Sequence, residues 1–222
     1  PATVKVLFLR VDFVSKSTTT VDAGLSTKYT GDGTWTDPVY AYGGNANYWV
    51  QKDKNDFIAF YTEASGGKLT LQVTVSPNVY RLPHKLAYYG TETSAALDAL
   101  VVDSVTAADA DVDFSAYDAI LIVHAGTGEE SDVNGDSPYD IWSLYYAAGA
   151  TLITADGVPI SEVIVMPQSD SQDGITVDPL GVYVHEFGHW LGLPDLYCTA
   201  GFCVLDGVGE WSLMGDGIYN AD

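Results

Sequence analysis

The feature that most constrains this chain is the run His185-Glu186-Phe187-Gly188-His189. It follows Asp178-Pro179, a pair that favours a helix start, because Asp is a good N-cap and proline suits the first helical turn. We expect a helix from there to about Leu191, ended at Gly192. Residues four apart on a helix lie on one face, so both imidazoles can reach one metal ion.

The residues around the two histidines suit a catalytic metal site. Glu186 projects beside them, where it could accept a proton from a metal-bound water without ligating the metal. A third ligand needs a chain reversal soon after the helix, which Gly192 can supply through its left-handed conformation before Asp195 arrives. Two histidines and one carboxylate leave a fourth position for water, as catalytic zinc requires. Capping a turn is the alternative role for Asp195, and the other acids that could complete the set are Asp206, Glu210 and Asp216.

The hydrophobic pattern places this motif at the end of a mixed fold. Strands and helices interleave before the chain becomes irregular and Gly-rich, which favours an α+β fold with a mixed twisted sheet covered by helices. We expect one domain over residues 1–222, with an N-terminal part of about 1–192 and a small C-terminal part of about 193–222. We expect strands at 4–11, 68–75, 119–124 and 162–166. Besides the helix that carries the two histidines, we expect helices at 45–64, 92–108 and 141–148. A long loop is expected over 15–44.

Charge excludes two classes of partner. The chain has 9 Lys and Arg against 30 Asp and Glu, a formal net charge of −21. Such acidity argues against binding a nucleic-acid backbone or an anionic membrane by charge. No apolar run approaches the ~20 residues that span a bilayer. The acidity fits a secreted protein, a calcium-binding one, or adaptation to salt.

The two cysteines, Cys198 and Cys203, lie close together in an acidic chain. This spacing favours a small-loop disulfide and an oxidising compartment over two free thiols. The chain begins at Pro1 and carries no signal peptide, so we expect a mature or excised segment of a secreted protein.

A second cation site is predicted in the acidic loop 129–140. There Asp132, Asn134 and Asp136 alternate as D-x-N-x-D. Alternating oxygen side chains begin many calcium loops, although the later glutamate of an EF-hand is absent, and a solvated acidic loop is the alternative. His124 and Tyr219 are weaker candidates for stabilising an oxyanion.

Together these segments resemble a known family. The zinc motif followed by Trp211-Ser212-Leu213-Met214 resembles the metzincins, in which a Met-containing turn lies beneath the zinc. Within them the chain is most similar to the immune inhibitor A-like, or M6, family of secreted metalloendopeptidases. The segments that carry this resemblance are 6–13 (VLFLRVDF), 60–71 (FYTEASGGKLTL), 80–90 (YRLPHKLAYYG), 122–130 (IVHAGTGEE) with Ile141-Trp142, and 185–197 (HEFGHWLGLPDLY).

The resemblance implies a metzincin-like zinc endopeptidase that is extracellular, acts on proteins or peptides, and uses calcium as a structural ion. His185, His189 and Asp195 match the family's zinc ligands, Glu186 its catalytic base, and Met214 its Met-turn. Family members usually continue past this turn, so a longer precursor with a pro-segment or further domains is expected. Two other hypotheses remain: a zinc hydrolase of small amides or esters, and a calcium-dependent binding module with a vestigial site. The intact Glu186 argues against the binding module.

Overall fold

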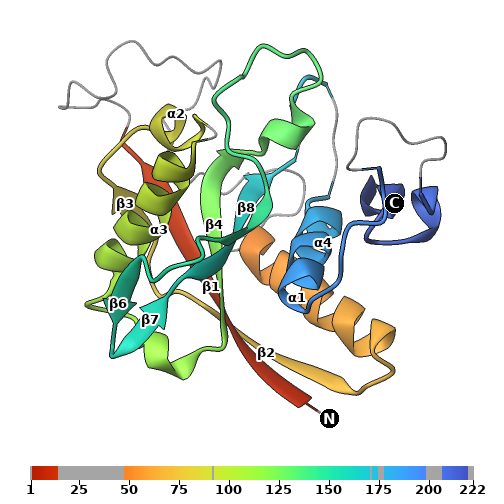
Figure 1. Cartoon of the computed structure of the whole chain (residues 1–222), viewed down its shortest axis with the longest axis horizontal. Helices are drawn as coiled ribbons and strands as arrows, with labels where there is room; N and C mark the ends of the chain where they lie inside the picture. The colour runs from red at the N-terminus through yellow and green to blue at the C-terminus, as the bar shows by residue number, and fades with distance from the viewer. Residues whose placement is uncertain are drawn as a thin grey trace.

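The computed structural model describes residues 2–14, 48–91, 93–170, 172–174, 178–198 and 207–219 (Figure 1). Its centre is a mixed sheet in the order β2-β1-β4-β8-β5, with β3 also paired to β1. All neighbours in this sheet run parallel except β5, which pairs antiparallel with β8 at one edge. The strands are β1 (Ala2–Phe13), β2 (Leu69–Val75), β3 (Tyr80–Leu82), β4 (Ala119–Thr127), β5 (Leu144–Ala147) and β8 (Glu162–Ser169).

Helices cover both faces of this sheet (Figure 1). On one face, α1 (Tyr48–Ala64) lies beside α4 (Leu180–Trp190). The other face is covered by α2 (Leu86–Tyr89), α3 (Ser94–Ala108) and a hairpin of β6 (Ile153–Ala155) and β7 (Val158–Ile160). Short 3-10 turns complete the described chain at η1 (Phe114–Ala116), η2 (Glu129–Ser131), η3 (Gly209–Trp211) and η4 (Asp216–Tyr219).

Strand β1 shows why the sheet needs helices on both sides. Its side chains alternate between two cores: Val6 and Phe8 pack on the α1 and α4 side, while Leu7 and Leu9 pack on the α3 side. All four are completely buried. The sequence of a strand that is buried on both faces is a nearly continuous run of apolar residues, and β1 has this pattern.

Most predicted elements are confirmed, with boundaries shifted by a few residues, and so is the mixed sheet covered by helices. The helix predicted at 141–148 is wrong, because residues 144–147 form β5 instead. Tyr145 and Tyr146 favour a strand, and pairing with β8 at the sheet edge provides backbone hydrogen bonds. The β6–β7 hairpin was not predicted, although its turn residues, Asp156 and Gly157, are a common two-residue hairpin signal.

In the described part of the chain, no helix is both long enough and apolar enough to span a membrane. The long loop predicted at 15–44 falls outside the described residues.

Candidate metal centre

Helix α4 carries the two histidines of the motif and is held firmly against the rest of the fold. Asp178 Oδ1 accepts a hydrogen bond from Leu180 N at 3.0 Å, so this side chain serves the helix start. Tyr61 Oη on α1 donates to Val184 O at 2.6 Å, and Tyr183 Oη on α4 donates to Pro167 O at 2.8 Å. The helix is thereby fixed both to its neighbour and to β8.

The chain reverses directly after α4. Gly192 has φ +90°, a conformation that side chains other than glycine rarely adopt. Its N–H donates to His189 O, and Leu193 N–H donates to Gly188 O. This pair of bonds is a Schellman motif, which caps the last helical carbonyls and turns the chain back. Asp195 follows three residues after the turn.

The reversal brings three ligand atoms together. His185 Nε2 and His189 Nε2 are 3.2 Å apart, and each lies 3.2 Å from Asp195 Oδ1. Donors that surround one zinc ion tetrahedrally at about 2.0 Å are separated by roughly 3.3 Å. The spacing of these three atoms therefore matches one face of a tetrahedral site.

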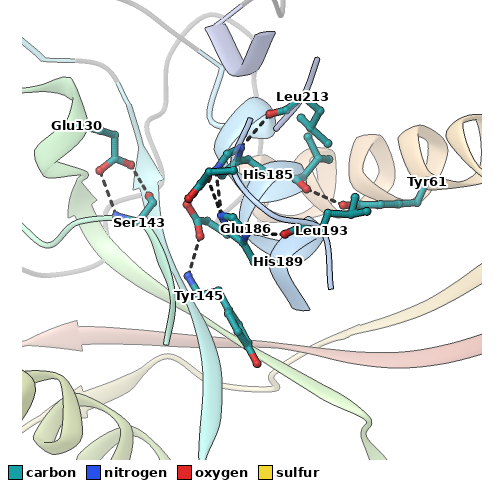
Figure 2. Close-up of polar contacts among 11 residues, drawn as sticks. Tyr61, Glu130, Ser143, Tyr145, His185, Glu186, His189, Leu193 and Leu213 are labelled. Carbon is teal, nitrogen blue, oxygen red and sulfur yellow. Dashed lines mark hydrogen bonds and ion pairs between the residues drawn. The ribbon is translucent and has the colours of Figure 1, made fainter. Parts of the chain in front are cut away.

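Hydrogen bonds on the outer side of each ring show that lone pairs face inward. His185 Nδ1 lies 2.9 Å from Leu213 O, and His189 Nδ1 lies 2.9 Å from Leu193 O (Figure 2). A carbonyl oxygen can only accept, so each Nδ1 donates, and in the neutral ring each Nε2 then presents its lone pair to the centre. Asp195 Oδ1 is buried and has no hydrogen-bond partner among the described residues. Three facing acceptors repel one another unless a cation lies between them, so the donor set fits a metal ion.

Glu186 lies beside this cluster without joining it. Its Oε2 accepts a hydrogen bond from Tyr145 N at 2.7 Å, while Oε1 is 4.0 Å from His185 Nε2 (Figure 2). Burial raises the pKa of Glu186 to about 8, and the Glu130 and Asp195 carboxylates act in the same direction, against the Tyr145 N–H. A bound cation would act in the opposite direction and favour the carboxylate.

A cavity of about 270 Å³ opens against Glu186 and His185. Its walls come from α4, from the segment around Trp142, and from the segment after Met214. The lining residues are Glu130, Trp142, Ser143, Val182, His185, Glu186, Tyr197, Gly215, Asp216 and Ile218. This is space for a ligand group next to the candidate metal site.

Met214 lies beneath the helix that carries the histidines. It is buried, and a Cβ added at Gly188 would come within 2.7 Å of its Sδ. Its carbonyl accepts a hydrogen bond from Leu196 N, which ties this turn to the segment that carries Asp195. Met214 therefore supports both sides of the ligand set.

Two of the three predicted calcium residues, Asp132 and Asp136, come together, with one addition. Asp132 and Asp136 cluster with Asp173, their carboxylate oxygens within 4.8 Å of one another. Asn134 contributes its backbone N–H, which donates to Asp173 Oδ2 at 3.1 Å. Asp173 could not be predicted from the D-x-N-x-D pattern, because it is distant in sequence.

Other predicted residues have different outcomes. His124 is completely buried, with its ring against Phe13 and its Nδ1 3.0 Å from Ala125 O, and it does not line the cavity. Cys198 is not a free thiol, but Cys203 and Asp206 lie outside the described residues, so the disulfide stays a prediction. The side chain of Tyr219 is likewise not described.

Sequence reasoning missed the backbone groups that orient the site. The N–H of Tyr145 and the carbonyls of Leu193 and Leu213 hold the three central side chains. Glu130 and Ser143, which line the cavity, were also missed. Glu130, Leu193 and Leu213 lie in segments that resemble the same family, whereas Ser143 and Tyr145 lie outside those segments.

Comparison with known proteins identifies a family for this chain. The family of the immune inhibitor A peptidase M6 catalytic domain matches residues 108–222, which include α4 and Met214. Immune inhibitor A of Bacillus thuringiensis subsp. alesti is 28% identical over 197 residues, taking in 73% of this chain and 28% of that protein. The chain thus spans less than a third of this relative's length. Because the family match covers more than half of the sequence, the chain belongs to the immune inhibitor A family of M6 metallopeptidases.

Proposed function

We propose that this chain is a secreted zinc-dependent endopeptidase of metzincin type, with residues 1–222 as its catalytic domain. His185, His189 and Asp195 would hold the zinc, and Met214 would form the Met-turn below it. The observation that carries this proposal is the convergence of three lone pairs at 3.2 Å separations beside the buried Glu186. Membership of the M6 family supports it.

The proposed mechanism assigns proton transfer to Glu186. Zinc at this site would supply a Lewis acid for the carbonyl of the scissile peptide bond. The Tyr145 N–H holds Glu186 Oε2, which leaves Oε1 on the side of the metal ligands. Glu186 takes a proton from the attacking water and delivers it to the nitrogen of the leaving amine. The net reaction adds one water across the peptide bond.

The direct test is Glu186→Gln, which keeps the size of the side chain but removes its basicity. We expect casein cleavage to fall by about 10²- to 10⁴-fold, the usual contribution of a general base. Zinc content, measured by elemental analysis, should not change. Glu63→Gln, at an exposed position on α1, is the control and should cleave normally. Undiminished cleavage by zinc-loaded Glu186→Gln would overturn the assignment of the base.

The same assay separates the other two hypotheses. A hydrolase of small amides or esters would leave casein intact yet turn over small substrates, and its activity would stop with a chelator. A calcium-dependent binding module would cleave neither. Peptidase activity that a chelator removes and zinc restores is the result expected here.

Two further parts of the proposal concern the rest of the chain. Calcium is proposed at the cluster of Asp132, Asp136 and Asp173, with Asn134 in the same loop, and its support is the proximity of the three carboxylates. A Cys198–Cys203 disulfide is proposed to fix the segment that leaves Asp195. Cys198 is not a free thiol, in keeping with that pairing and with an extracellular location.

A further inference from the structure

The walls of the cavity beside Glu186 differ in chemistry along their length. Val182 on α4 and Ile218 in η4 offer aliphatic surface, and Trp142 and Tyr197 offer aromatic rings. The remaining polar wall contains two carboxylates outside the proposed catalytic set, those of Glu130 and Asp216. A group that fills this space would therefore meet an apolar surface together with negative charge.

The Glu130 carboxylate is held in place by its surroundings. It accepts a hydrogen bond from Ser143 N at 3.1 Å and another from Ser143 Oγ (Figure 2). Gly128 leaves the space in which this carboxylate lies, because a Cβ there would overlap it. An anion fixed in this way can recognise a cation at a lower entropic cost than a freely rotating surface glutamate.

In the part of the chain that the structure describes, little can neutralise the Glu130 and Asp216 carboxylates. All 9 lysines and arginines lie at or before Lys85, whereas every cavity-lining residue lies between Glu130 and Ile218. Lys52, which α1 brings toward α4, is already bound to Asp56 and Asp178. No described lysine or arginine lines the cavity. Among the described residues, then, no cationic side chain in the cavity complements Glu130 and Asp216, and a cationic group of a ligand would do so.

We propose that this cavity binds a lysine or arginine side chain of the substrate, at one of the two residues that flank the cleaved bond. This inference rests on the proposed function and adds a specificity to it. The aliphatic stem packs against Val182 and Ile218, and the cationic group lies near Glu130 and Asp216. Trp142 and Tyr197 add aromatic surface that favours a cation. An acidic side chain at the same substrate position is rejected by like charge.

The test uses peptides that differ at a single residue. Arginine is compared with citrulline, its uncharged isostere, on each side of the cleaved bond in turn, and leucine and glutamate peptides complete the series. We expect kcat/KM for arginine to exceed that for citrulline by about tenfold on one side, and the glutamate peptide to be poorest. Glu130→Gln, whose amide oxygen can still accept one hydrogen bond from Ser143, should bring the ratio of kcat/KM for arginine to that for citrulline toward one.

Two controls separate local recognition from overall charge. Asp216→Asn, like Glu130→Gln, should lower the ratio of kcat/KM for the arginine peptide to that for the citrulline peptide. Asp109→Asn removes one negative charge at an exposed position at the end of α3, away from the cavity, and should leave the preference unchanged. Equal cleavage of arginine and citrulline peptides by the wild type, or an unchanged ratio in both Glu130→Gln and Asp216→Asn, would overturn the proposal.

A binding measurement makes this outcome independent of catalysis. Calorimetry with the Glu186→Gln protein should show about tenfold tighter binding of the arginine peptide than of the citrulline peptide. If the wild type cleaves no peptide but this binding ratio holds, the proposed peptidase function fails and the cationic site stands. If all peptides are cleaved alike and bind alike, the peptidase stands and the cationic site is wrong.

Discussion

Two clusters among the described residues could hold a cation, and their hydrogen bonds differ in direction. In the cluster of His185, His189 and Asp195, each histidine donates its Nδ1–H outward to a backbone carbonyl, so that lone pairs converge at the centre. In the acidic cluster, backbone N–H groups point toward the carboxylates. Asp132 accepts from the N–H groups of Asp136 and Ser137, at 3.1 and 2.6 Å.

The difference shows what makes a group of ligands into a strong metal site. The acidic loop stabilises its carboxylates with its own N–H donors, so its charge is partly compensated before any ion binds. The histidine cluster has no such compensation on its inner side among the described residues, and His185 Nε2 and Asp195 Oδ1 are buried there. We therefore expect tight zinc binding at the first cluster and weak calcium binding at the second.

The largest effect is expected from removing Asp195. Asp195→Ala should weaken zinc binding by at least about 100-fold, because loss of a direct ligand should exceed the 10- to 100-fold effect of losing an outer partner. Zinc content after dialysis measures this, with cleavage of casein as a second readout. Glu210→Ala is the control, since Glu210 lies exposed in η3 and outside the ligand cluster. If Asp195→Ala kept its zinc while Glu210→Ala lost it, the metzincin ligand set would be wrong.

A smaller effect is expected from Gly192→Ala, which tests the chain reversal. The position has φ +90° with open space around it, so alanine should cost about 1–2 kcal/mol through backbone strain alone. The carbonyl of the next residue, Leu193, accepts the hydrogen bond from His189 Nδ1 that orients this ring. A shift of the turn would disturb that bond, so zinc binding should also weaken by about tenfold.

Gly174→Ala provides a matched control beside the other cluster. Gly174 has φ +84°, also with open space, and it follows Asp173. Thermal unfolding should show a similar loss of stability in both variants, whereas competition with a chelator should show weaker zinc in Gly192→Ala alone. Equal zinc affinities in the two variants would mean that the reversal does not position the ligands.

The smallest effect is expected from calcium. With zinc already bound, calcium at tenfold over its Kd should stabilise the protein by about 1.4 kcal/mol. For a chain of this size that corresponds to about 3 to 6 °C in Tm. Asp173→Asn should abolish the shift, and zinc content should stay constant throughout. A Tm that calcium leaves unchanged, or an equal rise in Asp173→Asn, would remove the calcium proposal.

Local patterns explain why much of the fold could be predicted. Strand β1 is a continuous apolar run and helix α3 is a contiguous segment rich in alanine and leucine, so both were located to within a few residues. Strand β5 was mistaken for a helix because it has only four residues, and its pairing with β8 decides its conformation. The position of the motif helix was readable because both its start and its end carry characteristic residues, Asp178 and Gly192.

Local sequence patterns are enough to indicate which side chains could bind a metal, because histidines four apart on a helix and an acid after a glycine turn require only local geometry. The tertiary structure decided which way those ligands face. His185 is oriented by the carbonyl of Leu213, 28 residues later, and Glu186 by the N–H of Tyr145, 41 residues earlier. Every residue but proline carries the same backbone groups, so no residue type marks these partners in the sequence. Only the packing of β5 and the Met214 segment against α4 selects them.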